Sequence, residues 1–281
     1  MKYVAKKEMS AMDLMKIHYA GASNSTLKDY FRNGRVRVNG KVVKMPSAQL
    51  STGDELAIGK AHLVVENDLP FELIYEDRDI IVVGKPTGIL TSGEGITNKP
   101  TLHALVDEYI GDRTNGRGRA YVVHRLDKEV GGLVLFAKSE DIVDALQNNW
   151  KNFTKKYLAL SRNDPPAEEG TVDTWLVEHK MKMHVARGAS ENAVHAITHY
   201  RWLRYIGENS LIEVTLETGK KNQIRAHLDH IGCPIIGDRK YGDEGPKNNV
   251  RLMASELEIF HPTSGKKFNW KISPSKKFLN P

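Results

Sequence analysis

Polar and apolar residues alternate in several short stretches of the chain, which is the pattern of strands with one buried face. Such strands are predicted at residues 35–42, 154–160 and 211–217. In the first of them the pair Asn39-Gly40 predicts a tight hairpin turn. Residues 72–83 predict a strand, an acidic turn and a second strand. The runs 121–123 and 133–137 are wholly apolar and indicate buried strands.

Apolar residues at helical spacing predict helices between these strands. Leu14, Ile17 and His18 indicate a helical face near the start of the chain, and further helices are predicted over residues 25–33 and 224–231. Two more helices are expected to begin after Thr101 and after Ser139. Ser25 is expected to cap the helix at 25–33 and Gly34 to end it, and Gly232 is expected to end the helix at 224–231.

The composition is that of a globular protein. At 281 residues and 40% hydrophobic content, the chain can form one medium domain and a small one. A single cysteine, Cys233, excludes an intramolecular disulfide, and no run of 18 apolar residues indicates a membrane span. We therefore expect a cytoplasmic protein without a membrane segment.

The net charge of +6 is unevenly distributed along the sequence. Residues 1–60 contain 11 Lys and Arg against 5 Asp and Glu, so the remainder of the chain is electrically balanced. A basic segment attached to a neutral body favours a polyanionic partner such as nucleic acid. An ordinary solvated surface is the alternative interpretation of the same excess.

A polar cluster lies between the two buried strands. The tetrad His124-Arg125-Leu126-Asp127 is followed by Gly131-Gly132 and by an apolar strand that ends in Ala137-Lys138. This arrangement resembles the catalytic motif of the RluA-type pseudouridine synthases. The resemblance implies that Asp127 is the essential catalytic residue.

Other segments match the same family in the same order, over about residues 72–272. They are Lys85-Pro86-Thr87-Gly88, the strand around Tyr157, Thr218-Gly219 with Gln223-Ile224-Arg225, and residues 237–242. The resemblance implies that Tyr157 lies against the uracil and that Arg225 is the buried partner of Asp127. It also implies that Arg125 fills the space left by an extruded base, and that His124 and Gln223 belong to the RNA-binding set.

Three segments depart from the family pattern. Val130-Gly131 replaces a Thr-Ser or Thr-Ala pair, and the added glycine is expected to loosen the segment after Asp127. Lys220 replaces the usual Arg, Lys221 replaces Thr or Ser, and Asn222 replaces His. Gly84 stands where the family usually has Asn. We interpret the Val130-Gly131 replacement as tuning of the activity; the sequence leaves open whether this replacement and Lys220-Lys221-Asn222 reduce it.

The basic N-terminal segment resembles the S4 RNA-binding domain. The matching residues are Gly34, Val36, Val38, Asn39, Gly40, Gly53 and Asp54. The resemblance implies a small α+β domain whose RNA face carries Lys28, Arg32, Arg35 and Arg37. The expected division is therefore an S4-like domain at 1–59, a linker at 60–71, and a synthase domain at 72–281 with a mixed, largely antiparallel sheet flanked by helices.

The resulting hypothesis is an RNA pseudouridine synthase that needs no cofactor and no metal. We expect a monomer that acts on structured RNA, ribosomal RNA rather than tRNA. Asp127 either attacks C1′ of the ribose or removes the C2′ proton, and the sequence leaves both mechanisms open. The alternatives are an inactive RNA-binding or ribosome-assembly protein, and a hydrolase that uses His124 with Asp127.

Overall fold

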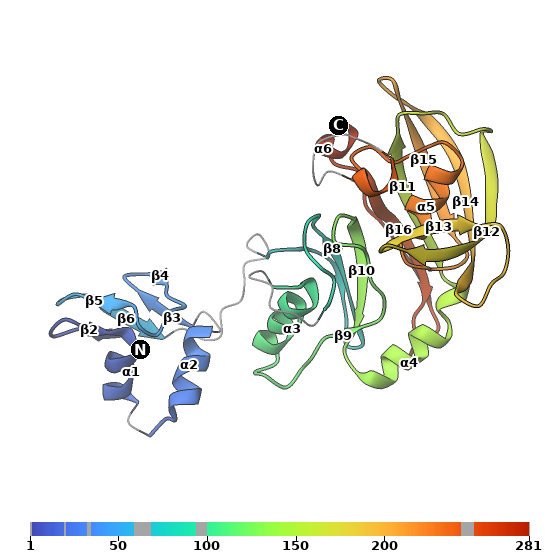
Figure 1. Ribbon diagram of the computed structural model, residues 1–281. Coiled ribbons are helices and arrows are strands. Elements are labelled where there is room, and N and C mark those ends of the chain that lie inside the picture. Colours follow the sequence, from blue (N-terminus) through green and yellow to red (C-terminus); the bar gives the residue numbers. More distant parts are fainter. Residues whose placement is uncertain are drawn as a thin grey trace. The chain divides into compact units, whose positions relative to one another are not determined.

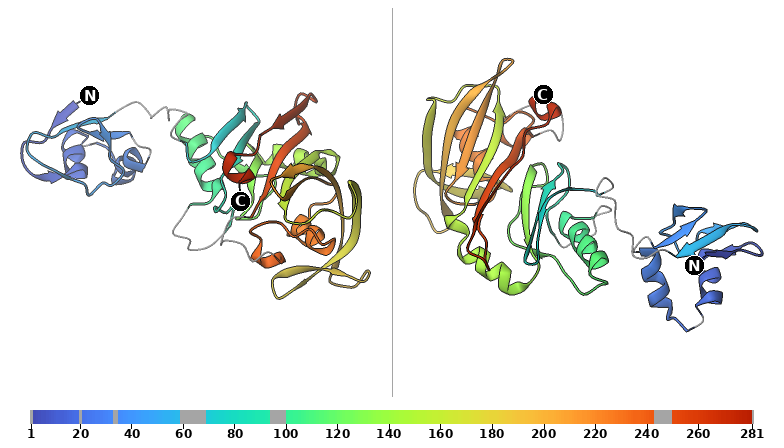
Figure 2. Two further views of the ribbon diagram at one scale, coloured as in Figure 1. Left: turned by 90° about the horizontal axis from the view of Figure 1, so that it is seen from above. Right: turned by 180° about the vertical axis from the view of Figure 1, so that it is seen from behind.

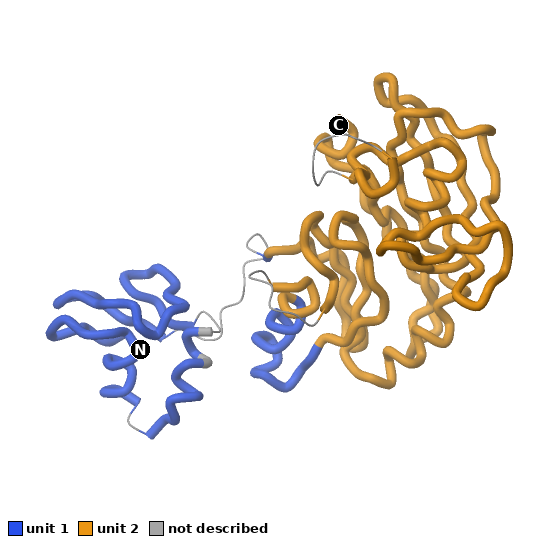
Figure 3. The backbone as a smooth tube through the Cα atoms, in the orientation of Figure 1, with its two compact units in different colours: residues 1–69, 106–119 blue, residues 70–105, 120–281 orange. Residues whose placement is uncertain are grey.

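The computed structural model describes residues 2–19, 21–32, 35–58, 69–93, 100–242 and 250–280, without the side chains of Asp29 and Arg32. The chain forms two compact units, one of residues 1–69 with 106–119 and the other of residues 70–105 with 120–281 (Figure 3). Most of the predicted linker, residues 60–68, lies outside the described residues.

The part of the first unit up to residue 58 contains two small sheets and two helices around an apolar core. Among its described residues, a four-stranded sheet has the order β1-β6-β3-β4, and β2 pairs with β5. Leu27 and Phe31 of α2 are buried in this core together with Val36 and Leu56 from the sheet. The elements of the chain up to residue 58 are β1 (Lys2–Val4), β2 (Met9–Ser10), α1 (Ala11–His18), α2 (Asn24–Arg32), β3 (Val36–Val38), β4 (Lys41–Val42), β5 (Gln49–Leu50) and β6 (Glu55–Ile58).

The predicted hairpin is confirmed. Asn39 and Gly40 both have positive φ angles, 50° and 81°, between the antiparallel strands β3 and β4. The side chain of Asn39 also donates to Asp54 at 2.8 Å and accepts the backbone N–H of Glu55 at 2.9 Å. These bonds tie the hairpin to the turn that precedes β6.

Two predictions about the helices of this unit are wrong. Ile17 is 60% exposed, because the buried face of α1 consists of Ala11, Met12, Leu14 and Met15. The cap of α2 is Ser23 rather than Ser25, since the Ser23 hydroxyl accepts the N–H of Thr26 at 3.1 Å. Gly34, the predicted end of this helix, lies outside the described residues.

The second unit is built on one large sheet. In the described part of the chain this sheet has eleven strands in the order β13-β12-β14-β15-β11-β16-β10-β8-β7, with β17 added beside β16 and β9 beside β10. Only the β10–β16 pair among these described pairings is parallel, so the predicted mixed, largely antiparallel sheet is confirmed. The strands are β7 (Glu72–Glu76), β8 (Ile80–Lys85), β9 (Tyr121–Val122), β10 (Gly131–Ala137), β11 (Thr154–Ser161), β12 (Glu169–His179), β13 (Lys182–Ala186), β14 (Ala193–Ile206), β15 (Asn209–Leu216), β16 (Leu252–Phe260) and β17 (Lys267–Lys271).

Helices pack against this sheet (Figures 1 and 2). Helix α4 (Glu140–Asn148) contacts β9 and β10, and α5 (Gln223–His230) contacts β13 and β14. Helix α3 (Leu102–Arg113) starts after Thr101, whose hydroxyl accepts the N–H of Ala104, as predicted. The last helix is α6 (Lys276–Leu279). None of the helices within the described residues combines the length and apolar character needed to cross a lipid bilayer.

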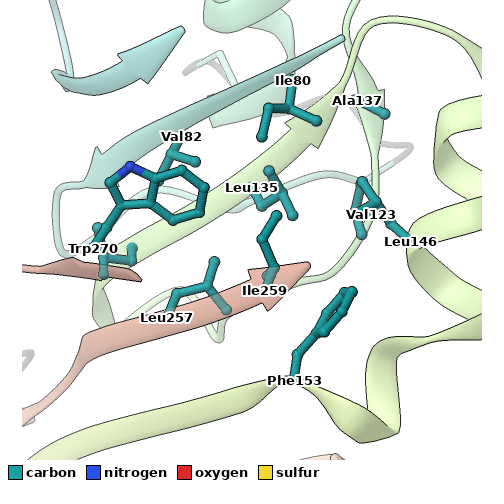
Figure 4. Packing of buried hydrophobic residues seen from close by; sticks show 11 residues of the cluster. Ile80, Val82, Val123, Leu135, Ala137, Leu146, Phe153, Leu257, Ile259 and Trp270 are labelled. Carbon is teal, nitrogen blue, oxygen red and sulfur yellow. The ribbon is translucent and has the colours of Figure 1, made fainter. Parts of the chain in front are cut away.

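The main core lies where β8, β10, β16 and β17 meet (Figure 4). Val82, Leu135 and Ile259 contribute buried side chains from three of these strands, and Trp270 covers them from β17. Every residue of β10 is buried, which explains its uninterrupted apolar sequence.

The added glycine, Gly131, is buried in β10, and a Cβ atom on it would lie 3.1 Å from Cγ2 of Thr87 and 3.2 Å from the carbonyl oxygen of Lys85. The prediction that it loosens the segment is therefore wrong, and the next glycine is packed more tightly still. Gly132 lies opposite Ala254 in the parallel β10–β16 pair and has a φ angle of 115°. A Cβ atom on Gly132 would lie 2.2 Å from the carbonyl oxygen of Ala254. Glycine is therefore required where these two strands approach each other.

Candidate active site

Asp127 lies in the loop between β9 and β10, and hydrogen bonds on both sides fix this loop. The hydroxyl of Thr91 donates to the carbonyl of Leu126 at 2.8 Å and accepts its N–H at 3.1 Å. Leu126 itself is buried. The carbonyl of Lys128, on the other side of Asp127, accepts a hydrogen bond from the ammonium of Lys85 at 3.2 Å.

Lys85 is a buried side chain that holds this loop against the end of β8. Its ammonium also donates to the carbonyls of Pro86 and Ile89, at 3.2 and 2.8 Å. Burial lowers the pKa of Lys85 to about 8. The Lys-Pro-x-Gly turn thus contributes to the site through backbone carbonyls.

Arg225 connects Asp127 to a second, fully buried aspartate. Its Nη1 donates to Oδ2 of Asp127 at 3.0 Å, while Nε and Nη2 bind both oxygens of Asp238 at 2.6 and 2.8 Å. Burial alone would lower the pKa of Arg225, but the two aspartates outweigh it and raise this pKa above its ordinary value. The predicted contact between Arg225 and Asp127 is present, and Asp238 orients the guanidinium that makes it.

Asn222 is a second donor to the same oxygen of Asp127. Its Nδ2 lies 2.5 Å from Oδ2, and its own Oδ1 accepts a hydrogen bond from the ammonium of Lys240 at 2.8 Å. Asn222 adopts a left-handed conformation, with a φ of 51°, at the start of α5. The sequence marked Asn222 as a departure from the family but assigned no role to it, to Lys240 or to Asp238.

Tyr157 and Asp127 line one pocket. Tyr157 projects from β11, between β15 and β16, and five apolar side chains line this space together with polar ones. The apolar ones are Leu126, Val130, Leu216, Ile224 and Leu252. Burial and the charge of Asp127 both raise the pKa of Tyr157, so its phenol stays protonated at neutral pH.

A larger cleft of about 750 Å³ opens from this pocket. Asp127, Tyr157 and the exposed Arg125 line both spaces. The cleft walls also carry Lys128, Lys155, Lys220 and Lys221. A pocket that combines a tyrosine ring, aliphatic side chains and a carboxylate, next to a basic cleft, suits a nucleobase attached to a phosphate backbone.

Three comparisons with known proteins agree on one family. The family model described as RNA pseudouridylate synthase matches residues 79–230. Ribosomal large subunit pseudouridine synthase D of Escherichia coli strain K12 is 33% identical over 280 residues, covering 88% of this chain and 82% of that protein. The chain belongs to the RNA pseudouridylate synthase family.

Other relatives and a solved structure agree with this assignment. The synthase is 35% identical over 236 residues to ribosomal large subunit pseudouridine synthase D of Vibrio parahaemolyticus, covering 80% of this chain and 70% of that one. The structure of human RNA pseudouridylate synthase domain containing 4 shares its fold with a TM-score of 0.62 at 24% identity, over 74% of this chain and 90% of that chain. The predicted family, fold and enzyme class are confirmed.

Two residues predicted to contact RNA form hydrogen bonds within the synthase, and the predicted contact of His124, which lines the cleft, stays a prediction. His124 accepts the N–H of Leu135 on Nε2 at 3.0 Å, and burial lowers its pKa to about 3. The amide of Gln223 accepts from Thr218 and from the N–H of Lys220, and it donates to Ile197 and Thr198. All hydrogen-bonding positions of this amide are thus occupied by protein, so the geometry does not support its predicted bond to RNA.

The four predicted RNA contacts of the N-terminal unit stay predictions. Lys28 is exposed, and the guanidinium of Arg35 lies 4.2 Å from the centre of the Tyr30 ring. Arg37 donates to the carbonyl of Gly40 at 3.2 Å. The side chain of Arg32 lies outside the described residues.

Proposed function

We propose that the protein converts uridine to pseudouridine in large-subunit ribosomal RNA, with Asp127 as the catalytic carboxylate. One observation carries the catalytic assignment. Arg225 and Asn222 both bind Oδ2 of Asp127, whereas Oδ1 has no hydrogen-bond partner among the described residues, and Asp127 lines the same pocket as Tyr157. Oδ1 is therefore the oxygen available for the reaction. The choice of RNA is supported by the names of the relatives, which act on the large ribosomal subunit.

The reaction breaks the N1–C1′ bond of uridine, turns the uracil and rejoins it to C1′ through C5. A proton leaves C5 and one is gained at N1, so no redox cofactor is needed. Asp127 acts either as the nucleophile at C1′ or as the base that removes the C2′ proton, which gives a glycal. Both routes need an anionic oxygen beside the ribose. The positive charge of Arg225 stabilises the carboxylate anion of Asp127.

Tyr157 and Arg125 prepare the substrate. The raised pKa of Tyr157 argues against a phenolate base, so its role is to pack against the extruded uracil. Extrusion costs a few kcal/mol of stacking energy. The exposed guanidinium of Arg125, which lines the mouth of the pocket, fills the space that the base leaves.

The N-terminal segment serves as the recruiting module in this proposal. Residues 1–59 form the S4-like domain, 60–71 the linker and 72–281 the synthase domain. Lys28, Arg32, Arg35 and Arg37 contact RNA phosphates, positioning the substrate without reading its sequence. The monomeric state and the cytoplasmic location expected from the sequence stay predictions.

The alternative is an RNA-binding assembly factor without turnover. The buried Asp238–Arg225–Asp127 chain favours the enzyme, since RNA binding alone has no use for a carboxylate held in a base-sized pocket. A hydrolase with His124 as base is disfavoured, because Nε2 of His124 already accepts the N–H of Leu135.

The test uses ribosomal RNA transcripts that carry tritium at C5 of uridine. We expect tritium release by the wild type, none by Asp127→Asn, and equal RNA affinity for both proteins. Tritium retention by the wild type together with tight RNA binding would identify the assembly factor, and release of free uracil would identify the hydrolase. Replacing Lys28, Arg35 and Arg37 by Met should flatten the salt dependence of RNA binding without changing kcat, and an unchanged slope would exclude the recruiting role.

A further inference from the structure

Lys155 is a buried cation that the proposed reaction does not use. It projects from β11 two residues before Tyr157, and only 8% of its surface is exposed. Its ammonium donates to the carbonyl of Trp150 at 2.9 Å. The same nitrogen lies 5.7 Å from the centre of the Trp150 ring, and within the described residues it has no carboxylate partner and no second hydrogen-bond acceptor. Two of its three N–H donors therefore lack a hydrogen-bond partner in the protein.

Such an arrangement costs folding free energy. A buried ammonium loses hydration, and here no ion pair compensates for that loss. Burial accordingly lowers the pKa of Lys155, and its charge helps to lower the pKa of the neighbouring His124. A lysine kept at this cost, in the wall of the active-site cleft, indicates a ligand that supplies the missing acceptors.

The neighbour of Lys155 in the sequence shows how an ordinary lysine of this strand is placed. Lys156 lies on the opposite face of the sheet, where it bridges Glu213 at 3.5 Å and Glu256 at 3.9 Å. Arg201 and Lys271 extend the same row with bonds to these two glutamates. The back face of the sheet is thus a ladder of paired charges, whereas the cleft face presents Lys155 without an acidic partner.

The charges of the cleft define the ligand. Among the described residues that line it, Arg125, Lys128, Lys155, Lys220 and Lys221 are cationic, and Asp127 is the single acid. Asp127 is held by Arg225 and Asn222, so the cleft presents a net positive surface to its ligand. Oxyanions of a nucleic-acid backbone are complementary to such a surface.

The position of Lys155 places this ligand next to the target nucleotide. Residues 155 and 157 point to the same side of β11, and two residues of a strand advance by about 6.6 Å. Tyr157 lines the uracil pocket, and Lys155 lines the adjoining part of the cleft beside Trp150. An RNA strand whose base enters the Tyr157 pocket therefore brings an adjacent oxygen of its chain within reach of Lys155.

We propose that Lys155 is the buried anchor of a phosphate subsite, which binds the phosphodiester adjoining the target uridine and so fixes the strand while the base is extruded. The proposal rests on the proposed function for the identity of the RNA. A phosphate and a base carbonyl both offer Lys155 an oxygen acceptor on the adjoining nucleotide, so a base carbonyl is the alternative ligand. The phosphate is favoured because every charged residue that lines the cleft is a lysine or an arginine, except Asp127.

Lys155→Met and Lys155→Arg test the anchor, with Lys156→Met as the matched control from the other face. With ribosomal RNA transcripts we expect Lys155→Met to raise KM about 10-fold with a change in kcat below about 2-fold. The slope of log affinity against log salt should fall by about 0.7. Lys155→Arg should recover most of the affinity, and Lys156→Met should match the wild type. A loss confined to kcat, or a lowered Tm with an unchanged salt slope, would make Lys155 a structural residue and overturn the proposal.

A second measurement identifies the acceptor. Once the converted uridine is mapped, transcripts are ligated with one neutral methylphosphonate on its 5′ or 3′ side, or with one abasic neighbour. We expect one methylphosphonate to weaken the wild type about 10-fold and to leave Lys155→Met unchanged, whereas the abasic neighbour should leave the difference between the two proteins intact. If the abasic neighbour removes that difference instead, the ligand is a base carbonyl and the phosphate subsite is rejected. If the wild type converts no uridine, the proposed function fails, while the salt slopes of the two proteins still decide the role of Lys155.

Discussion

The amide of Asn222 donates a hydrogen bond of 2.5 Å to Oδ2 of Asp127, the same oxygen that Arg225 binds at 3.0 Å. The orientation of this amide is not arbitrary, because Lys240 donates to its Oδ1 at 2.8 Å and Tyr241 approaches the same atom at 3.4 Å. These two donors on Oδ2 restrict rotation of the Asp127 carboxylate about its Cβ–Cγ bond. The second oxygen, Oδ1, keeps no hydrogen-bond donor among the described residues, and Asp127 lines the pocket.

Asn222→Ala should lower kcat about 10- to 100-fold, because it removes a hydrogen bond to a charged group and frees the Asp127 side chain to rotate. Lys240→Met should lower kcat by a smaller factor, since Lys240 acts only through Asn222. RNA affinity should change little in Asn222→Ala. The measurement is single-turnover tritium release with excess enzyme, paired with an RNA-binding titration.

Asn163→Ala is the control for these variants, because its amide donates to the carbonyl of Gly232 outside the pocket. Asn222→His restores the residue type that the resemblance led us to expect at this position and should recover part of the rate. Equal kcat values for Asn222→Ala and the wild type would remove Asn222 from the positioning role.

Asp238→Asn should destabilise the protein more than Asp127→Asn. Asp238 is fully buried and binds Arg225 through both oxygens, so its neutralisation leaves a buried guanidinium with a weakened partner. We expect a loss of about 3 kcal/mol or more in the free energy of unfolding. Asp127→Asn leaves the Asp238–Arg225 pair intact and should cost below about 1.5 kcal/mol. Urea unfolding of both variants at one pH measures the difference, and the reverse order would refute the division of roles between the two aspartates.

Local patterns in the sequence predicted many of the elements correctly, but not the strands β12, β13 and β14. The strands around 35–42 and 211–217, and the helix after Ser139, depend on alternation, helical spacing and capping, which nearby residues determine. The wrong predictions at Ile17 and Ser25 have a common cause. Neighbouring residues were equally plausible for the buried helix face or for the helix cap, and only packing in the folded chain selects among them.

The candidate site was only partly predictable. The resemblance to a family supplied Asp127, Tyr157 and Arg225, which lie far apart in the sequence. Asp238 and Lys240 were seen as parts of a matching segment, but no local pattern shows that their side chains converge on Arg225 and Asn222. Gln223 shows the opposite error, since a residue inside a functional motif proved to be a fully bonded structural amide.

Gly132→Ala should prevent stable folding or cost about 2–4 kcal/mol in the free energy of unfolding. The new Cβ would approach the backbone of Ala254 to 2.2 Å, and alanine is strained at a φ of 115°. Gly188→Ala is the control, because no atom lies within 4 Å of its added Cβ and its φ is unexceptional. Thermal unfolding of both variants tests this prediction, and equal melting temperatures would show that β10 and β16 can separate without cost.

Acid should destabilise the protein through its buried histidines. His227 is fully buried, with its two ring nitrogens bonded to the hydroxyls of Thr174 and Thr198. Burial lowers its pKa from 6.5 to about 4, and burial likewise lowers the pKa of His124 to about 3. Both rings are therefore neutral in the folded chain between about pH 4 and 6.5, whereas the unfolded chain takes up a proton at each. The unfolded state binds more protons in this window, so stability rises with pH there and falls as the pH is lowered.

Each histidine should remove up to about 1.4 kcal/mol of stability for each pH unit below 6.5, until its folded-state pKa is reached. Urea unfolding at pH 7 and pH 5 measures this loss. In His227→Gln, an uncharged side chain replaces the ring, so the loss between the two pH values should shrink by about 2 kcal/mol even if the variant is less stable at pH 7. The variant His184→Gln, at an exposed histidine that does not contribute to the pKa shift of His227, should retain the full loss. If His227→Gln and the wild type lose the same free energy between pH 7 and pH 5, His227 is not the titrating group.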